Sequence, residues 1–404
     1  MHATTFLLTN HQNGAIGKIA LYMKNLVTLR FMLVSLFAIM SMAVSADIIE
    51  YSTDDGFKYR LDTEAKTAEL AEYNGSATEV SISESVTYGD VVYSVTSLGE
   101  NCFERCSSLT SINIPSSVTS LGEYCFYGCS SLASINIPSS VTSLGEDCFA
   151  YCSSLASINI PSSVTSLGED CFYECSSLKS INIPSSVTSL GEYCFYRCSS
   201  LTSINIPSSV TSLGRWCFEG CSSLTSIVVD AGNSVYDSRE NCNAVIETKS
   251  NTMICGCAGT VIPSSVTSLG EWCFYGCSSL TSINIPSSVK SLGESCFSNC
   301  SSLKTVTCEI PAPIGDNSIF IDTPINEATL YVPEASLNSY KTTSPWSGFG
   351  TILAIKSSGI ETNTVGTSAT VDAIYNLEGK RNDGIKSGMN ILCMSNGTTR
   401  KIMN

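Results

Sequence analysis

The sequence contains very little histidine. Of its 404 residues only His2 and His11 are histidines, and both precede the apolar run from Phe31 to Met40. If that run belongs to an export signal that is removed, the mature chain has no histidine at all. A Ser-His-Asp or Cys-His nucleophile and a histidine-ligated metal site are then excluded.

Charged residues are also scarce, and most of them are acidic. Only 14% of residues are Asp, Glu, Lys or Arg, the formal net charge is −15, and the sequence pI is about 4.6. An acidic chain is repelled by phosphate backbones and by anionic lipid surfaces. We therefore expect no nucleic acid partner and no binding to anionic membranes.

What the sequence has instead is a short unit repeated at a fixed period. The stretch LGEYCFYGCSSLASINIPSSVTS runs from Leu121 to Ser143. Near-copies of it begin at Leu98, Leu144, Leu167, Leu190, Leu213, Leu269 and Leu292. A unit this short cannot bury its own apolar face and becomes stable only by stacking on its neighbours. The repeat therefore predicts an elongated solenoid.

Each unit has the pattern of a short strand followed by a bend. Ile135 and Ile137 alternate with polar residues, which is typical of a half-buried strand, and Pro138 ends it. We expect Gly145 to adopt a positive φ at the bend, and Glu146 to begin a short helical or irregular segment. Stacked units would then give one parallel strand per turn.

Equivalent residues of stacked units should form columns through the core. The isoleucine column is predicted to contain Ile112, Ile135, Ile158, Ile181, Ile204, Ile227 and Ile283. The phenylalanine column is predicted to contain Phe103, Phe126, Phe149, Phe172, Phe195, Phe218, Phe274 and Phe297. Continuous aliphatic and aromatic spines of this kind would supply most of the stability.

The repeat is interrupted once, between Leu213 and Leu269. This stretch holds two units and exceeds the length of two regular ones, so that one of them is predicted to carry an insertion. Within it, NAVIE and TMIC flank the polar turn TKSN and predict a β-hairpin that projects from the solenoid. Insertions on one face of a solenoid often bind partners, and the alternative is a tolerated surface elaboration.

The segments outside the repeat are expected to export, cap and extend it. A start at Met23, followed by Lys24, the apolar run and small residues, has the three regions of a secretory signal, and a retained membrane anchor is the alternative. After cleavage no membrane span is expected. The predicted organisation is an upstream extension plus signal peptide in 1–46, an amino-terminal β cap in 47–97, the solenoid in 98–308 with the hairpin at about 234–257, a carboxy-terminal cap in 309–356, a linker in 357–372 and a short tail in 373–404.

Cysteine is unusually frequent. Sixteen of the 21 cysteines form eight Cys-Phe-x-x-Cys pairs, from Cys102 and Cys106 to Cys296 and Cys300. They can be buried free thiols, disulfides of an exported protein, or thiolates of a metal ladder. The spacing within each pair is poor for a disulfide and matches metal-binding patterns only weakly. We therefore favour buried free thiols, and expect no metal and no other cofactor.

The repeat unit resembles that of the BspA-like bacterial leucine-rich repeat proteins, whose pattern runs IG-x-x-AF-x-x-C-x-x-L-x-x-I-x-IP-x-S-V-x-x. The segments VYDSRENCNAVIETKSNTMICGC and YVPEASLNSYKTTSPWSGFGTI also resemble that class, so that the resemblance covers roughly residues 50–356. This chain differs in having cysteine where the family has alanine. The resemblance implies a leucine-rich-repeat solenoid of the α/β class with about nine units, in which short parallel strands face turns or short helical segments.

The tail from Ala373, which begins AIYNLEGKR, carries a separate and shorter resemblance. It is similar to carboxy-terminal segments of proteins exported by anaerobic gut and oral bacteria, some of which are sorting signals to the cell surface. The alternative is a small accessory pair of strands.

The main resemblance implies a non-enzymatic protein of the adhesin type, secreted or held at the bacterial cell surface, with a protein or glycan of host or neighbouring cells as its ligand. Two surfaces offer candidate ligand-binding residues. On the strand face these are Asn113, Asn136, Asn159, Asn182 and Asn205, whose alternative role is to bond to one another and to water. On the opposite side they are the partly exposed aromatic residues Tyr124, Tyr193, Trp216, Trp272 and Tyr275.

A glutamate column accompanies these aromatic residues. It contains Glu100, Glu123, Glu146, Glu169, Glu192, Glu271 and Glu294, and Arg215 breaks it. The column is either a set of solvated helix starts or a weak cation site, and we favour the former. No cluster of unlike residues interrupts the repeat in the way that a grafted active site would, which argues against an enzyme. The alternative function is a structural spacer without a specific ligand.

Overall fold

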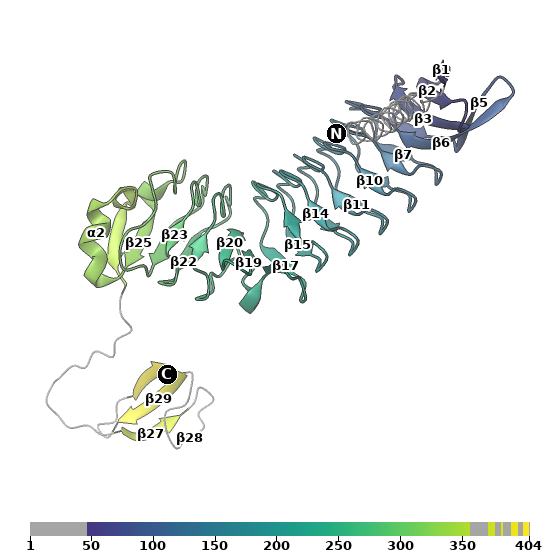
Figure 1. Ribbon diagram of the computed structural model, residues 1–404. Coiled ribbons are helices and arrows are strands. Elements are labelled where there is room, and N and C mark those ends of the chain that lie inside the picture. The colour runs from purple at the N-terminus through teal and green to yellow at the C-terminus, as the bar shows by residue number, and fades with distance from the viewer. Residues whose placement is uncertain (1–46, 356–370, 376–380, 383–388, 395–398, 404) are drawn as a thin grey trace, which may run out of the picture.

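The protein is an elongated solenoid of about 13 turns with repeats of roughly 23 residues, which confirms the predicted fold (Figure 1). The computed structural model describes residues 47–355, 371–375, 381–382, 389–394 and 399–403. The predicted signal peptide and most of the predicted linker lie outside the described residues and stay predictions. The turns outnumber the nine predicted units because the segments at both ends continue the stack.

One face of the solenoid is a column of short parallel strands. Each strand buries its central isoleucine or valine and exposes the residues on either side, as the alternation of the sequence predicts. The isoleucine column is confirmed. The strands are β4 (Glu79–Ser81), β7 (Ser111–Asn113), β9 (Ser134–Asn136), β11 (Ser157–Asn159), β13 (Ser180–Asn182), β15 (Ser203–Ile206), β17 (Ser226–Val229), β22 (Ser282–Ile285) and β24 (Thr305–Cys308).

A second column consists of two-residue strands, each of which contributes one inward leucine. Neighbouring members pair in parallel and in register, so that Leu144 lies beside Leu121. The column comprises β8 (Ser120–Leu121), β10 (Ser143–Leu144), β12 (Ser166–Leu167), β14 (Ser189–Leu190), β16 (Ser212–Leu213), β21 (Ser268–Leu269) and β23 (Ser291–Leu292).

The amino-terminal segment covers the open end of both columns. Its sheet runs in the order β1 (Ile48–Ser52), β2 (Phe57–Asp62), β3 (Thr67–Tyr73) and β6 (Val91–Leu98), with β5 (Ser85–Tyr88) on the other edge of β6. β6 then pairs in parallel with β8, so that this sheet merges into the second column. Ring contacts from Phe57 to Tyr73 and from Tyr73 to Phe103 carry the aromatic core into the first repeat.

At the carboxy-terminal end, β25 (Thr329–Val332) and β26 (Thr351–Ala354) extend the parallel sheet beyond β24. Between them lie α2 (Leu337–Thr342) and the short 3₁₀ segments η3 (Glu334–Ser336) and η4 (Trp346–Gly348), and η2 (Ile325–Glu327) precedes β25. Trp346 and Phe349 are buried against the last turns.

The described parts of the tail form a four-stranded antiparallel sheet. Its order is β28 (Arg381–Asn382), β27 (Val371–Tyr375), β29 (Met389–Met394) and β30 (Thr399–Met403). From the sequence, a small accessory pair of strands was the alternative to a sorting signal. Its role as a sorting signal stays a prediction.

The segment after each inward leucine is a series of turns and contains no helix in the described repeats. Of the two expected forms, helical or irregular, the irregular one is present, because the residue two positions after the glycine has a left-handed backbone, as at Asp147 with φ 53° and Asp170 with φ 51°. The backbone N–H of Asp147 therefore bonds to the carbonyl of Glu169 in the next turn, at 3.0 Å. The glutamate column consequently does not mark helix starts.

The repeated glycine serves close packing and not a positive φ, which corrects our expectation for Gly145. A Cβ atom placed on Gly145 would lie 2.4 Å from the backbone of the preceding turn, and one on Gly191 would lie 2.4 Å from Gly168. Real Cβ atoms do not approach backbone atoms this closely. The glycine column therefore lets successive backbones touch.

Gly191→Ala is expected to lower the free energy of unfolding by about 1–3 kcal/mol, because the two turns must separate to admit the methyl group. Gly168→Ala is the matched control, since a Cβ atom there would meet its nearest neighbour at 3.4 Å. Urea denaturation of both variants measures the difference. Equal losses in the two variants would contradict the close-packing account.

The phenylalanine column is a stack of parallel rings with one break. Ring centroids are 5.3 to 5.6 Å apart from Phe103 to Phe218, and Phe274, Phe297 and Phe320 form a second stack. In the described part of the chain no ring contact joins Phe218 to Phe274. The prediction of one continuous aromatic spine was therefore wrong at the interrupted unit.

The second cysteines of the Cys-Phe-x-x-Cys pairs are hydrogen-bond donors as well as small core residues. The Sγ atoms of Cys152 and Cys175 donate to the carbonyls of Phe126 and Phe149 in the preceding turn, at 3.2 and 3.1 Å. In the last turn the hydroxyl of Thr323 makes the equivalent bond to Phe297, at 2.6 Å. Burial raises the pKa of these thiols, so they keep the proton that they donate. All cysteines from Cys102 to Cys308 are free thiols, and most are buried.

The interruption contains the predicted hairpin, but its strands belong to the stack. β19 (Val245–Glu247) pairs antiparallel with β20 (Thr252–Cys255), and β18 (Tyr236–Asp237) joins β19. β20 in turn pairs in parallel with β21, which places Met253 in the leucine column. Met253, Val245 and Ile246 are buried, and only the turn between the two strands is exposed. The hairpin therefore does not project as a separate arm.

Candidate functional site

Nine aromatic rings follow one another along the outer side of the turns. We call this row the aromatic ladder: Tyr124, Tyr127, Tyr151, Tyr173, Tyr193, Tyr196, Trp216, Trp272 and Tyr275. Ring contacts join all nine, with Trp216 stacked on Tyr193 and Tyr196 packed against Tyr173 and Tyr193. The centroid distances run from 4.7 Å for Tyr173 and Tyr196 to 6.4 Å for Tyr173 and Tyr193. None of these rings is fully buried, and Tyr151 is 38% exposed. Rigid aromatic rings of this kind are effective contact groups in protein recognition.

The turns hold these side chains in place through their backbones. Tyr124, Tyr193, Trp216 and Trp272 have positive φ angles between 50° and 60°. The N–H of Tyr124 bonds to the carbonyl of Glu146 in the next turn at 2.8 Å, and that of Trp272 bonds to Glu294 at 2.9 Å. Backbone bonds between turns therefore fix the spacing of the rings, so that the ladder is preorganised.

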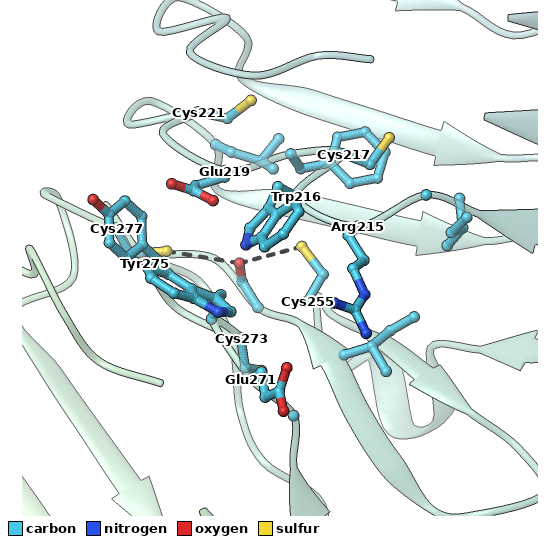
Figure 2. A pocket seen from close by; sticks show the side chains of 18 residues that line it. Arg215, Trp216, Cys217, Glu219, Cys221, Cys255, Glu271, Cys273, Tyr275 and Cys277 are labelled. Carbon is cyan, nitrogen blue, oxygen red and sulfur yellow. Dashed lines mark hydrogen bonds between the residues drawn. The ribbon is translucent and has the colours of Figure 1, made fainter. Parts of the chain in front are cut away.

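The ladder crosses a hollow at the interrupted unit. The hollow has a volume of about 300 Å³, which is at the lower end of the range for ligand pockets. Figure 2 shows Trp216, Tyr275, Glu219 and several cysteine thiols around it. Its floor is apolar and includes Phe218, Leu224, Cys217, Cys221, Cys255, Cys273 and Cys277, and its rim carries Trp216, Trp272, Tyr275, Glu219, Glu271 and Arg215.

The hollow exists because one unit has a shortened loop. In a regular unit the segment from Leu190 to Ile206 is nearly twice as long as the equivalent segment from Met253 to Ile262. Gly256 takes the place of the phenylalanine: its N–H bonds to the carbonyl of Cys273 at 2.8 Å, as the phenylalanine N–H does elsewhere. The unit therefore contributes no ring to the phenylalanine column.

The neighbouring loops close over the top of this gap. The hydroxyl of Ser279 donates to the carbonyl of Ser222 at 2.7 Å, and a Cβ atom on Gly276 would lie 3.2 Å from Gly220. The rings of Trp216 and Trp272 meet edge to face at 6.3 Å. These contacts join turns that are two units apart and leave the space beneath them open.

Glu219 is the half-buried one of the two acidic residues of the hollow, and Glu271 is exposed. Burial raises the pKa of its carboxyl to about 7, although the guanidinium of Arg197 acts in the opposite direction. In the described part of the chain its carboxylate accepts no hydrogen bond, and Arg197 is already paired with Glu174 at 3.1 Å. Glu219 also stands where Tyr127, Tyr173 and Tyr275 stand in other units. It is therefore a half-buried carboxylate without a partner.

The structure brings together three of the predicted ligand-binding residues and separates the rest. Trp216, Trp272 and Tyr275 line the hollow, and Tyr124 and Tyr193 lie further along the ladder. Sequence reasoning missed Tyr151, Tyr173, Glu219 and Cys255. The first two could have been found from the aromatic residues within their Cys-Phe-x-x-Cys loops, and Glu219 from its departure from the repeat. A cluster of unlike residues does break the repeat here, contrary to our expectation.

The predicted asparagine residues lie on the other face of the solenoid. Asn113, Asn136, Asn159, Asn182 and Asn205 are exposed, and the first four lie side by side in the sheet. Because strand and loop both point their apolar side chains into one core, their exposed side chains point away from each other. Asn113 donates to the hydroxyl of Ser81 at 3.4 Å. The two predicted surfaces are therefore separate.

Asp170 lies beside the ladder and has a raised pKa. Burial, and then the charges of Asp147 and Glu169, raise the pKa of Asp170 to about 6, and its Oδ1 has no hydrogen-bond partner. No group of histidine, cysteine, aspartate or glutamate among the described residues is arranged to hold a metal ion.

The stability of the folded protein is expected to fall as pH rises through the raised pKa of Asp170. The folded protein binds the Asp170 proton more tightly than the unfolded chain does, so its contribution is full below the ordinary pKa of 3.8 and is lost as pH passes 6. Between pH 5 and 7.5 the Tm of Asp170→Asn should fall less than that of the wild type. Glu123→Gln, in the exposed glutamate column, should retain the wild-type fall. If Asp170→Asn and the wild type fall equally, Asp170 is not the responsible group.

The parallel strands, leucine column and turn-rich loops define a leucine-rich-repeat solenoid. The BspA type leucine rich repeat region matches the chain in six copies, over residues 79–176, 147–243 and 253–341. The match covers more than half of the sequence, and the protein belongs to this family.

Two solved structures of bacterial proteins are similar to the chain. The chain is 25% identical to a leucine rich cell surface protein from Faecalibacterium prausnitzii, with 77% of this chain and 96% of that chain covered and a TM-score of 0.56. It is 19% identical to a leucine-rich repeat protein from Eubacterium ventriosum, with 76% and 85% covered and a TM-score of 0.47. No curated protein sequence matches the chain. Among the residues that the structure describes, no helix is long and apolar enough to cross a membrane.

Proposed function

We propose that this protein is a non-enzymatic binding protein of the adhesin type, which acts outside the cell or on its surface. Its ligand is a protein or glycan of the host matrix or of neighbouring cells. The residues that bind this ligand are those of the aromatic ladder and of the hollow beneath it. The observation that carries the proposal is the continuous row of nine partly exposed rings held by backbone hydrogen bonds.

The arrangement of the ladder supports binding over a purely structural role. Exposed aromatic rings cost solubility and add little to the core, because the buried phenylalanine stacks run beneath them. A spacer needs only the buried columns, and the strand face meets that need with serine and asparagine at its exposed positions. Rings gathered on one side are thus better explained by contact with a partner.

The proposed location rests on the relatives and on the ends of the chain. The similar protein from Faecalibacterium prausnitzii is described as a cell surface protein. The predicted signal peptide in 1–46 would export this chain, and the tail in 373–404 would direct it to the surface.

Binding of the purified protein to an array of matrix proteins, mucins and glycans tests the proposal. Two double variants separate the faces: Tyr151→Ser with Tyr173→Ser on the ladder, and Asn136→Ser with Asn159→Ser on the strand face. We expect saturable binding that weakens at least tenfold in the ladder variant and is unchanged in the strand-face variant. Loss of binding in the strand-face variant alone would place the binding site on the strand face. If the protein binds nothing on the array, the alternative function of a structural spacer is favoured.

A further inference from the structure

The shape of the hollow points to a flat ring as its occupant. In the regular units from Phe126 to Phe195 the equivalent position holds a phenylalanine, whose ring stacks on both neighbours at 5.3 to 5.6 Å. In the interrupted unit Gly256 provides no side chain, and a Cβ atom there would lie 2.2 Å from the ring of Phe274. The ring of Phe274 thus occupies the side-chain space of residue 256, and the hollow lies on the Phe218 side of it, because Phe218 lines the hollow and Phe274 does not. The apolar floor of thiols, Phe218 and Leu224 offers contacts suited to a ring from outside.

The rim of the hollow points to a positive charge on that occupant. Two carboxylates, Glu219 and Glu271, and one guanidinium, Arg215, lie there. Figure 2 shows Arg215 on the opposite side of Trp216 from Glu219 and Tyr275, and its guanidinium lies 5.8 Å from the centre of the Trp216 ring. The side that holds Glu219, Trp272 and Tyr275 is thus acidic and aromatic. Aromatic faces and a half-buried carboxylate both attract a cation.

We propose that the hollow binds an aromatic side chain that has a basic group next to it in a partner protein. The aromatic ring packs against Phe218 in the apolar floor, and the cation pairs with Glu219 at the rim. This inference rests on the proposed function and names the anchor by which the partner is held.

The ladder is the reason for assigning the anchor to a protein and not to a free aromatic amine. It extends without a gap from Tyr275 and the hollow to Tyr124. A free amine would fill the hollow and leave the rest of the ladder uncovered. An extended polypeptide that inserts one ring can also lie over the neighbouring tyrosine rings.

The first test uses short fluorescent peptides and the full protein. One peptide has adjacent tryptophan and lysine, the second replaces the lysine by glutamate, and the third replaces the tryptophan by alanine. We expect fluorescence anisotropy to show saturable binding of the first and at least tenfold weaker binding of the other two. Equal affinity for the lysine and glutamate peptides would overturn the role of the cation, and equal affinity for the alanine peptide would overturn the role of the ring.

Variants of the hollow locate the binding. Glu219→Gln should weaken the tryptophan–lysine peptide about tenfold and remove its preference over the glutamate peptide. Trp216→Ala should abolish binding, and Trp216→Phe, which keeps a ring and so preserves the fold more readily, should retain part of it. Glu294→Gln, outside the hollow, is the matched control and should bind as the wild type. Unchanged binding by Glu219→Gln and Trp216→Ala would place the peptide elsewhere.

The pH dependence gives an independent readout. The groups that act on Glu219 or are affected by it are Arg197, Tyr193 and Tyr196, and Arg197 stays charged while burial raises the pKa of both tyrosines. Glu219 is therefore the group expected to titrate near pH 7. Because a cationic ligand favours its ionised form, affinity should rise about tenfold from pH 6 to 8 and should be flat in Glu219→Gln. The same slope in both proteins would contradict the pairing.

Two further experiments distinguish a protein partner from a free aromatic amine, and failure of the anchor from failure of the proposed function. Tryptamine that binds with this pH dependence while no peptide binds would overturn the assignment to a protein partner. A ligand from the matrix and glycan array whose binding survives both Trp216→Ala and Glu219→Gln would refute the anchor and leave the proposed function intact. Only the absence of any array ligand would count against the proposed function itself.

Discussion

Phe172→Ala is expected to lower the free energy of unfolding by about 3–5 kcal/mol. The ring is fully buried and stacks on Phe149 and Phe195, at 5.6 and 5.4 Å. Its removal leaves a cavity in the middle of the longer stack, where each turn is held only by its two neighbours. Urea denaturation followed by circular dichroism measures the loss.

Tyr173→Ala is the control for this prediction, because it removes a ring of similar size one residue away. Tyr173 lies on the surface in the aromatic ladder, so that its loss should cost about 1 kcal/mol or less. Comparable losses in the two variants would mean that the buried column does not dominate stability.

Trp346→Ala is expected to have an effect of similar size at the carboxy-terminal end, about 3–5 kcal/mol. The side chain is fully buried, its ring lies 5.3 Å from those of Phe320 and Tyr340, and its Nε1 donates to the carbonyl of Ile314 at 2.9 Å. Because the terminal turns have a neighbour on one side only, the loss should be local. Hydrogen exchange should quicken in β25 and β26 and stay slow in β9 to β13.

Trp346→Phe separates packing from the hydrogen bond. It keeps an aromatic ring in the cap and loses the donor to Ile314, so an intermediate loss is expected. Uniformly faster exchange along the whole solenoid in Trp346→Ala would contradict a local cap and would indicate that all the turns unfold together.

The repeated parts of the fold were predictable because all eight near-copies of the unit indicate the same local structure. Alternation at Ile135 and Ile137 gave the strand, and the fixed period gave the parallel columns. What the pattern could not give was the role of its glycine. A glycine at position 145 suggests a bend in the chain. Only the distance to the preceding turn reveals that its lack of a Cβ atom is needed for close packing.

The hollow was hidden by a compensation in length. The unit from Leu213 to Met253 is longer than a regular one, whereas the unit from Met253 to Leu269 is shorter, so that part of the gain in the first is cancelled by the loss in the second. The sequence displays only the net excess. Identifying the loss requires the pairing of Met253 with Leu269, which is a property of the three-dimensional stack. The partly exposed aromatic residues were found because they vary within the repeat, whereas their union into one ladder depends on the spacing of the turns.

The measurement that tests the central claim most directly restores the missing loop. In this variant the segment between Met253 and Ile262 is replaced by the regular one between Leu190 and Ile206, which returns a phenylalanine to the column. Its binding to the ligand found on the array is compared with that of the wild type, and thermal unfolding verifies the fold. We predict that binding is lost while Tm is equal or higher. Full binding by a stable restored variant would contradict the claim that the hollow is the recognition site.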